Sequence, residues 1–216
     1  MSSALGISHR RRLPMPLFLL AFALISGCDE ESTQPVDDDW SELLPLTSPE
    51  NVIQDLQIIY NDKTHSAAER LAAYANLLHP DFIFRFQEGD INTGLPPGWE
   101  LESERLAHKN IFDAQEAGAI YAMELGITHD QAQDLTPPEP GREGWVQIFA
   151  TNVHMRLMFN LEDGIEVAGD QAEFKFPPAE NGLFRIGEWV DMPRPGLIRE
   201  AAVESATWGG IKAQYQ

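Results

Sequence analysis

His79 and Asp81, which flank Pro80, are the pair of side chains in this sequence that is most suggestive of chemistry. A histidine and a carboxylate two residues apart can orient a water molecule or ligate a cation. The same three residues also suit a joint between a helix and a strand, because proline stops the helix, histidine complements the helix dipole and aspartate accepts hydrogen bonds from the turn. We favour the structural interpretation.

The remaining histidines and the familiar sequence motifs point to no reaction. His65, His108, His129 and His154 lack a metal-site spacing such as H-E-x-x-H, and the sequence contains no G-x-S-x-G, Walker or dinucleotide-binding pattern. We therefore expect no metal and no cofactor, and the catalytic residues, if there are any, stay unknown.

The only cysteine, Cys28, follows an apolar run over 17–25 and a basic patch over 10–12. This order is typical of a secretory signal peptide, and the run is too short to span a bilayer comfortably. Ile25-Ser26-Gly27-Cys28 resembles the lipobox of bacterial lipoproteins. The resemblance implies cleavage before Cys28, followed by attachment of a diacylglyceryl thioether to the cysteine and of an amide-linked third acyl chain, of the palmitate type. It also implies anchoring of the protein to a membrane of the cell envelope, with a soluble domain outside the cytoplasm. An ordinary signal peptide and an uncleaved anchor are the alternatives.

The charge of the chain limits its partners. Residues 1–28 contain three arginines and no acidic residue, so their removal changes the net charge from −19 to −22. Nucleic acids and anionic headgroups bind through positive charge, so we expect no nucleic-acid partner. Acidity of this kind favours solubility. A role in binding divalent cations is the alternative, although no D-x-D-x-D-G loop is present.

Hydrophobic periodicity predicts the elements that position any site. The acidic segment 29–47 has no periodicity and contains prolines, as expected of a tether. Capping residues and apolar spacing predict helices, and alternation predicts strands. The expected helices cover 48–62, 66–78 and 100–115 (with Leu101, Leu106, Ile111 and Phe112 buried), and the expected strands cover 82–86, 119–127, 145–160, 164–177 and 183–191, with a loop over 128–144 and a hairpin turn at Asp163-Gly164.

This order predicts one α+β domain over 48–216, in which N-terminal helices pack on a curved antiparallel sheet. The chain resembles the nuclear transport factor 2-like superfamily (cystatin-like, ketosteroid-isomerase-like) over roughly 48–192. The resemblance rests on the helix through Tyr60, on the segment 78–82 and on the closing strand 184–191. The segments 48–52, 95–99 and 207–212 also resemble an uncharacterised set of bacterial lipoproteins with this fold.

The resemblance implies a pocket between the helices and the concave face of the sheet. The alternation over 145–159 predicts that Trp145, Phe149 and Val153 face this interior, together with the polar Gln147 and Thr151. The opposite face, with His154, fits solvent or a partner. The candidate pocket residues are Tyr60, Tyr74, Gln147, Phe149, Thr151 and Trp189. Hydrogen-bonded polar groups in the core are the alternative for Gln147 and Thr151.

We expect this domain to bind a small apolar ligand or a partner protein, without catalysis. The first alternative is an isomerase or cyclase that uses a pocket carboxylate as general base. The second is a structural component of the envelope, with homodimerisation through the open sheet face. A deep apolar pocket favours binding, an inward carboxylate of raised pKa favours the enzyme, and a filled interior favours the structural role.

Overall fold

The computed structural model describes residues 40–92, 94–137, 139–160, 163–192 and 207–216. Asp38–Gln216 forms one compact unit. Within the described ranges no helix is long and apolar enough to cross a membrane. Cys28 and most of the expected tether lie outside these residues.

The helices begin where the sequence supplies caps. They are α1 (Pro49–Asn61), α2 (Ala67–Asn76), α3 (Glu88–Ile91), α4 (Leu101–Glu116) and α5 (Trp208–Gln214). Ser48 caps α1 by accepting from the amide of Asn51, and Ser66 forms a capping box with Glu69 at the start of α2. The three expected helices are therefore confirmed to within two residues at each end.

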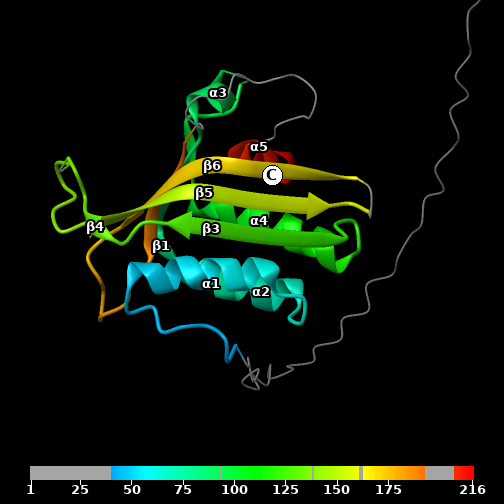
Figure 1. Ribbon diagram of the computed structural model, residues 1–216, viewed down its shortest axis with the longest axis horizontal. Helices are drawn as coiled ribbons and strands as arrows, with labels where there is room; N and C mark the ends of the chain where they lie inside the picture. The colour runs from blue at the N-terminus through cyan, green and yellow to red at the C-terminus, as the bar shows by residue number, and fades with distance from the viewer. Residues whose placement is uncertain (1–39, 93, 138, 161–162, 193–206) are drawn as a thin grey trace, which may run out of the picture. The chain divides into compact units, whose positions relative to one another are not determined.

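The strands form one sheet in the order β2-β1-β7-β6-β5-β3, with β4 paired to β5 (Figure 1). They are β1 (Leu78–Arg85), β2 (Gly98–Glu100), β3 (Ala122–His129), β4 (Gln133–Asp134), β5 (Val146–Met158), β6 (Gly164–Phe176) and β7 (Ile186–Met192). The pair β1 and β7 is parallel and the other pairs are antiparallel. This arrangement confirms the expected α+β class, with helices on a strongly curved, mostly antiparallel sheet.

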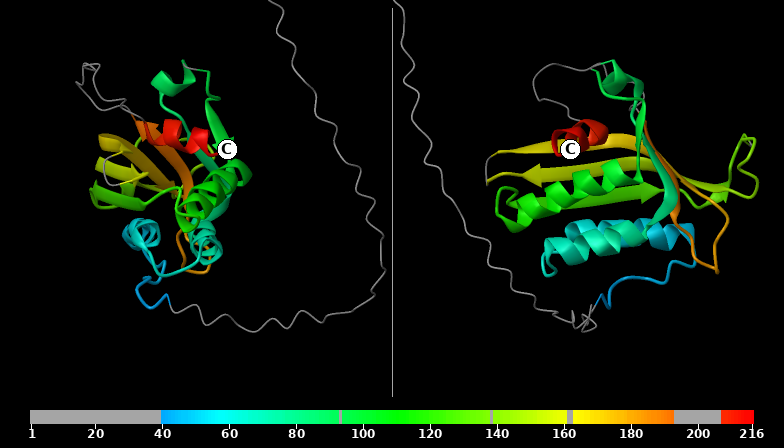
Figure 2. Two further views of the ribbon diagram at one scale, coloured as in Figure 1. Left: turned by 90° about the vertical axis from the view of Figure 1, so that its right-hand side faces the viewer. Right: turned by 180° about the vertical axis from the view of Figure 1, so that it is seen from behind.

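The helices α1, α2, α4 and α5 lie on one side of the sheet (Figure 2). The inner face carries a row of large side chains in register across five strands. Directly paired residues share a face of a sheet, and the row runs Trp99, Phe84, Trp189, Phe174, Ile148. All five are buried, so this row is the floor of the interior.

The expected alternation over 145–159 was wrong in its first half. An irregularity in the pairing of β5 lies between Ala150 and Val153, and it changes which alternate residues face inward. Ile148 and Ala150 are buried on the inner face, whereas Phe149 is only partly buried and Thr151 is exposed. From Val153 onward the predicted alternation holds, because Val153, Met155 and Leu157 are buried and Phe159 is partly buried.

The boundary that the sequence indicated at residue 47 was too late. Leu46 is buried, Trp40 stacks on His65 with ring centroids 3.8 Å apart, and the amide of Leu44 donates to Asp55 at 2.8 Å. The segment 40–47 therefore packs on the domain. Its few apolar residues show no periodicity, and only the tertiary contacts show that they are covered.

Candidate functional site

A group of polar side chains lies in the interior between α4 and the sheet. Helix α4 contributes Glu104 and His108, which lie one turn apart and face inward with Ala107, Ile111 and Phe112. Both polar residues are fully buried. The other members of the group come from α1 (Tyr60), α2 (Tyr74), β2 (Trp99) and α5 (Lys212). We call these six residues the interior polar cluster.

Glu104 is the centre of the interior polar cluster. Its Oε1 atom accepts from the Tyr74 hydroxyl and from the Lys212 ammonium group, each at 2.6 Å, and its Oε2 atom accepts from Trp99 Nε1 at 2.6 Å. Burial raises the pKa of the Glu104 carboxyl, but the charge of Lys212 and the hydrogen bonds from Lys212 and Tyr74 hold it below its ordinary value. Glu104 is therefore a buried, ionised carboxylate.

His108 is a neutral member of the cluster. Burial lowers its pKa to about 4, despite the nearby charge of Glu104. Its Nδ1 atom lies 2.8 Å from the carbonyl oxygen of Glu104, which can only accept, so Nδ1 carries the proton. Nε2 then accepts from the hydroxyl of Tyr60. This arrangement fixes the tautomer of the imidazole without any charge on it.

Helix α5 closes the interior with its own side chains. Ile211 and Lys212 are fully buried, and the Lys212 ammonium group lies 3.6 Å from the ring centroid of Phe84 and 4.1 Å from that of Trp189. Burial lowers the pKa of Lys212 to about 8, against the attraction of Glu104, which raises it. Lys212 is therefore still charged at neutral pH.

Asp191 lies at the edge of the same space, beneath the start of α5. Its Oδ2 atom accepts from the amide of Gly209 at 3.0 Å, and a Cβ atom on Gly209 would lie 2.6 Å from the Phe86 ring, so only glycine allows this approach. Burial raises the pKa of Asp191 to about 7, although the Gly209 hydrogen bond lowers it. Asp191 thus titrates in the physiological range.

The structure brings together half of the predicted pocket residues. Tyr60 and Tyr74 have ring centroids 6.1 Å apart, and both belong to the interior polar cluster; Trp189 lies beside Lys212. Gln147 pairs with Lys175, which pairs with Glu188, so it belongs to the convex face and not to the interior. Together with the displaced positions of Phe149 and Thr151, this means that the three candidates from β5 do not line the interior.

The sequence suggested that Asp191, together with Trp189, could line the mouth of a pocket, whereas Glu104, His108 and Lys212 were missed as members of the interior. The sequence of α4 does contain a signal for two of them. Helical spacing places one stripe of side chains on the same face of this helix, at positions 104, 107, 108, 111 and 112. Leu106, which the sequence suggested as a buried position, is 46% exposed. Placing the stripe on Glu104 and His108 would have identified two polar residues at core positions.

The convex face carries a second ionic cluster, centred on Glu188. Arg85 donates to Glu188 at 2.9 Å, Arg142 donates to its other oxygen, and Lys175 joins it to Glu139. Burial raises the pKa of Glu188, but the arginines hold it below its ordinary value. These contacts hold Glu139 and Arg142 against strands β6 and β7, so we assign them a structural role.

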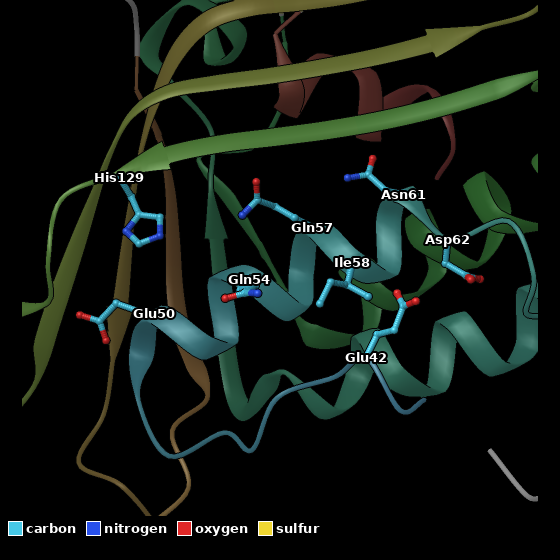
Figure 3. Close-up of a pocket in the computed structure, with 8 residues that line it drawn as sticks. All are labelled: Glu42, Glu50, Gln54, Gln57, Ile58, Asn61, Asp62 and His129. Atoms are coloured by element: carbon cyan, nitrogen blue, oxygen red, sulfur yellow. The ribbon is translucent and has the colours of Figure 1, made fainter. Parts of the chain in front are cut away.

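A surface groove of about 650 Å³ runs along the outer side of α1 (Figure 3). Its polar side chains serve the fold. Asn61 exchanges two hydrogen bonds with the backbone of Leu125, and Gln57 accepts from the amide of Ile127 at 2.8 Å. Strand β3 is an edge strand, and these amide groups cover its free backbone groups.

His79 contacts both Asp81 and Glu180. The amide of Asp81 donates to His79 Nδ1 at 3.1 Å, and Glu180 lies 3.8 Å from Nε2. Both residues lie within β1, which begins at Leu78, earlier than the expected 82–86. Among the described residues no group of three or more potential ligands is arranged for a metal ion.

Comparison with known proteins identifies no family model and no curated protein that matches this chain. Several solved structures are similar to it. Naphthalene 1,2-dioxygenase, in a structure with indole in its active site, is 9% identical over 74% of this chain and 81% of that chain, with a TM-score of 0.48. A protein of unknown function from Mycobacterium tuberculosis is 14% identical over 85% of this chain and 94% of that chain, with a TM-score of 0.47.

A third similar structure is a protein from Nostoc punctiforme whose fold is described as cystatin-like. It is 10% identical over 69% of this chain and 90% of that chain, with a TM-score of 0.41. The fold of this protein is an α+β domain whose helices cover one face of a curled, mostly antiparallel sheet.

Proposed function

We propose that this protein is an envelope lipoprotein, anchored through Cys28, whose domain binds a small molecule in the interior beneath α5. The single observation that carries the proposal is the interior polar cluster. A buried ion pair such as Glu104 with Lys212 stabilises a fold less well than packed apolar residues of similar volume. Buried groups with shifted pKa values are instead common at binding and catalytic sites.

The walls of the interior suit a ligand that is mostly apolar. Phe84, Trp99, Phe174 and Trp189 are buried and contact one another in a chain of aromatic rings. Trp99 in this chain donates to Glu104. A ligand would therefore place one polar group at Glu104 and its apolar part against these rings. Ile211 and Lys212 fill this space, and a filled interior by itself favours the structural role. The binding proposal therefore requires that α5 moves aside.

The test compares the access of an apolar probe to the interior in three proteins. Ile211→Ala removes a fully buried side chain of α5, whereas Gln214→Ala removes an exposed side chain of the same helix. With N-phenyl-1-naphthylamine, Ile211→Ala should give saturable fluorescence with one probe per chain, and Gln214→Ala should behave as the wild type. Near-ultraviolet circular dichroism confirms that each protein keeps its packing. Absence of saturable binding to correctly folded Ile211→Ala would refute the proposal and favour a structural role.

Asp191 supports a second candidate function, the isomerase-type enzyme. A carboxyl group with a pKa of about 7 at the edge of an aromatic interior has the properties of a general base. Conversion of 3-cyclohexenone to its conjugated isomer, followed by ultraviolet absorbance, tests this candidate. If Asp191 is the general base, the wild type converts the probe faster than the background rate, Asp191→Asn loses this activity, and Glu166→Gln, at an exposed position, keeps it. A wild-type rate equal to background excludes this chemistry for the probe.

A further inference from the structure

The surroundings of the Lys212 ammonium group have the composition of a receptor for a cation. The group lies 2.6 Å from Glu104 Oε1 and within 4.1 Å of the ring centroids of Phe84 and Trp189. A carboxylate combined with aromatic faces is a common way to bind an ammonium ion in a dry environment. The receptor groups belong to α4, β1 and β7, whereas the cation comes from the C-terminal helix α5.

The carboxylate of this receptor is oriented by groups other than the cation. Tyr74 and Trp99 each donate a hydrogen bond to Glu104 at 2.6 Å, one to each oxygen. Tyr74 is itself stacked on His108, with ring centroids 3.9 Å apart. Because these side chains are buried on α2, β2 and α4, the carboxylate keeps its direction whichever cation lies in front of it.

Helix α5 is too short to be stable without its contacts with the rest of the domain. It has seven residues, and an isolated helix shorter than roughly 12 residues is marginal in water. It is held by contacts with the domain: Thr207 donates to Asp90 at 2.7 Å, Gly209 donates to Asp191, and Asn110 donates to the carbonyl of Tyr215 at 2.6 Å. A ligand that competes with the Lys212 ammonium group for Glu104 therefore breaks the contact by which α5 reaches deepest into the interior.

We propose that Glu104, Phe84 and Trp189 form a binding site for the ammonium group of an alkylamine ligand, and that Lys212 is a tethered occupant which this ligand displaces. The inference rests on the proposed function and names its ligand class. The stem of Lys212 shows the shape that the site accepts: an unbranched alkyl chain that ends in a primary ammonium group. The apolar walls described above then hold the rest of the ligand.

Chemical rescue of Lys212→Ala in the full chain tests this site. The substitution removes the atoms of Lys212 beyond Cβ, which n-propylammonium reproduces. At a concentration ten times its Kd, n-propylammonium should raise the Tm of Lys212→Ala by roughly 3–6 °C. Neutral n-propanol should give no comparable rise. Glu104→Gln/Lys212→Ala has the same cavity without the carboxylate charge, and it should lose the preference for the amine.

Equal effects of the amine and the alcohol on Lys212→Ala, or an undiminished amine effect in the double variant, would overturn the site. If Lys212→Ala does not fold, the wild type provides the test: n-hexylammonium should accelerate amide hydrogen exchange in α5, and unchanged exchange at saturating amine would overturn the proposal. The results distinguish a failure of the ammonium site from a failure of the proposed function. Binding of the neutral naphthylamine probe to Ile211→Ala, together with no response to amines, would keep the interior as a binding site and reject only the ligand class.

Discussion

Removal of the positive charge of Lys212 should lower the free energy of unfolding, because it leaves the buried charge of Glu104 uncompensated. In Lys212→Met the apolar stem is retained, but a carboxylate that is fully buried loses the ammonium group 2.6 Å away. Breaking a buried ion pair in this way costs about 3–5 kcal/mol, because the remaining charge is uncompensated. Tyr74 and Trp99 still donate to Glu104, so part of the charge stays solvated by the protein.

Protonation of Glu104 sets an upper limit on this cost. The reference pKa of a glutamate is 4.5, and each pH unit above it adds about 1.4 kcal/mol to the free energy of protonation. Lys212→Met should therefore lose about 3 kcal/mol of unfolding free energy at pH 7 but under about 1 kcal/mol at pH 5. With a urea m-value of about 2 kcal/mol/M, the midpoint at pH 7 falls by about 1.5 M.

Urea unfolding of a double-mutant cycle checks the argument. Glu104→Gln/Lys212→Met removes both charges, and it should recover at least about 2 kcal/mol relative to Lys212→Met at pH 7. Lys109→Met, which removes an exposed lysine paired with Asp113, should change stability by less than about 1 kcal/mol. A cost for Lys212→Met that is the same at pH 5 and pH 7, or additive effects of the two substitutions, would refute a buried, ionised Glu104.

Four further predictions follow from the sequence and the fold. Cys28→Ala should abolish incorporation of labelled fatty acid and move the protein out of the detergent phase; labelling that persists would contradict the lipid anchor. Asp191→Asn should become more stable relative to the wild type as the pH rises from about 4 to about 7, because the raised pKa of Asp191 makes its stabilising contribution disappear over this window; a pH-independent difference in urea midpoint would reject the shift. Phe174→Ala should cost about 3–5 kcal/mol in urea unfolding, whereas Thr151→Ala on the exposed side should cost under about 0.5 kcal/mol; a cost for Thr151→Ala as large as that for Phe174→Ala would mean that Thr151 faces inward, as the alternation predicted. Leu46→Ala should lower the free energy of unfolding by about 2 kcal/mol or more, since Leu46 is buried; an unchanged midpoint would mean that the segment 40–47 is a tether after all.

The parts of the fold that depend on neighbouring residues could be predicted from the sequence. Ser48 and Pro49, and Ser66 with Glu69, mark helix starts by hydrogen bonds within one turn, so α1 and α2 were located closely. Asp163-Gly164 marked the connection between the two longest strands for the same reason. The sequence also determined the class of the fold, because helices followed by long alternating strands can bury their apolar sides in few ways.

Other features depend on partners that are distant in the sequence. The irregularity in β5 after Ala150 arises from its pairing with β3 and β6, so residue alternation alone placed Phe149 and Thr151 on the wrong face. Helix α5 has seven residues, too few for a periodic pattern, and it is held by its docking contacts.

The chemical character of the interior was decided in the same way. Glu104 and Lys212 are 108 positions apart, and each by itself looks like an ordinary surface charge. Only the tertiary structure brings them together in a dry interior, where desolvation changes their pKa values and makes their attraction strong. The sequence by itself determined the local elements and the α+β class. Tertiary structure decided which charges are buried together, because burial depends on the whole set of neighbours and not on the residue itself.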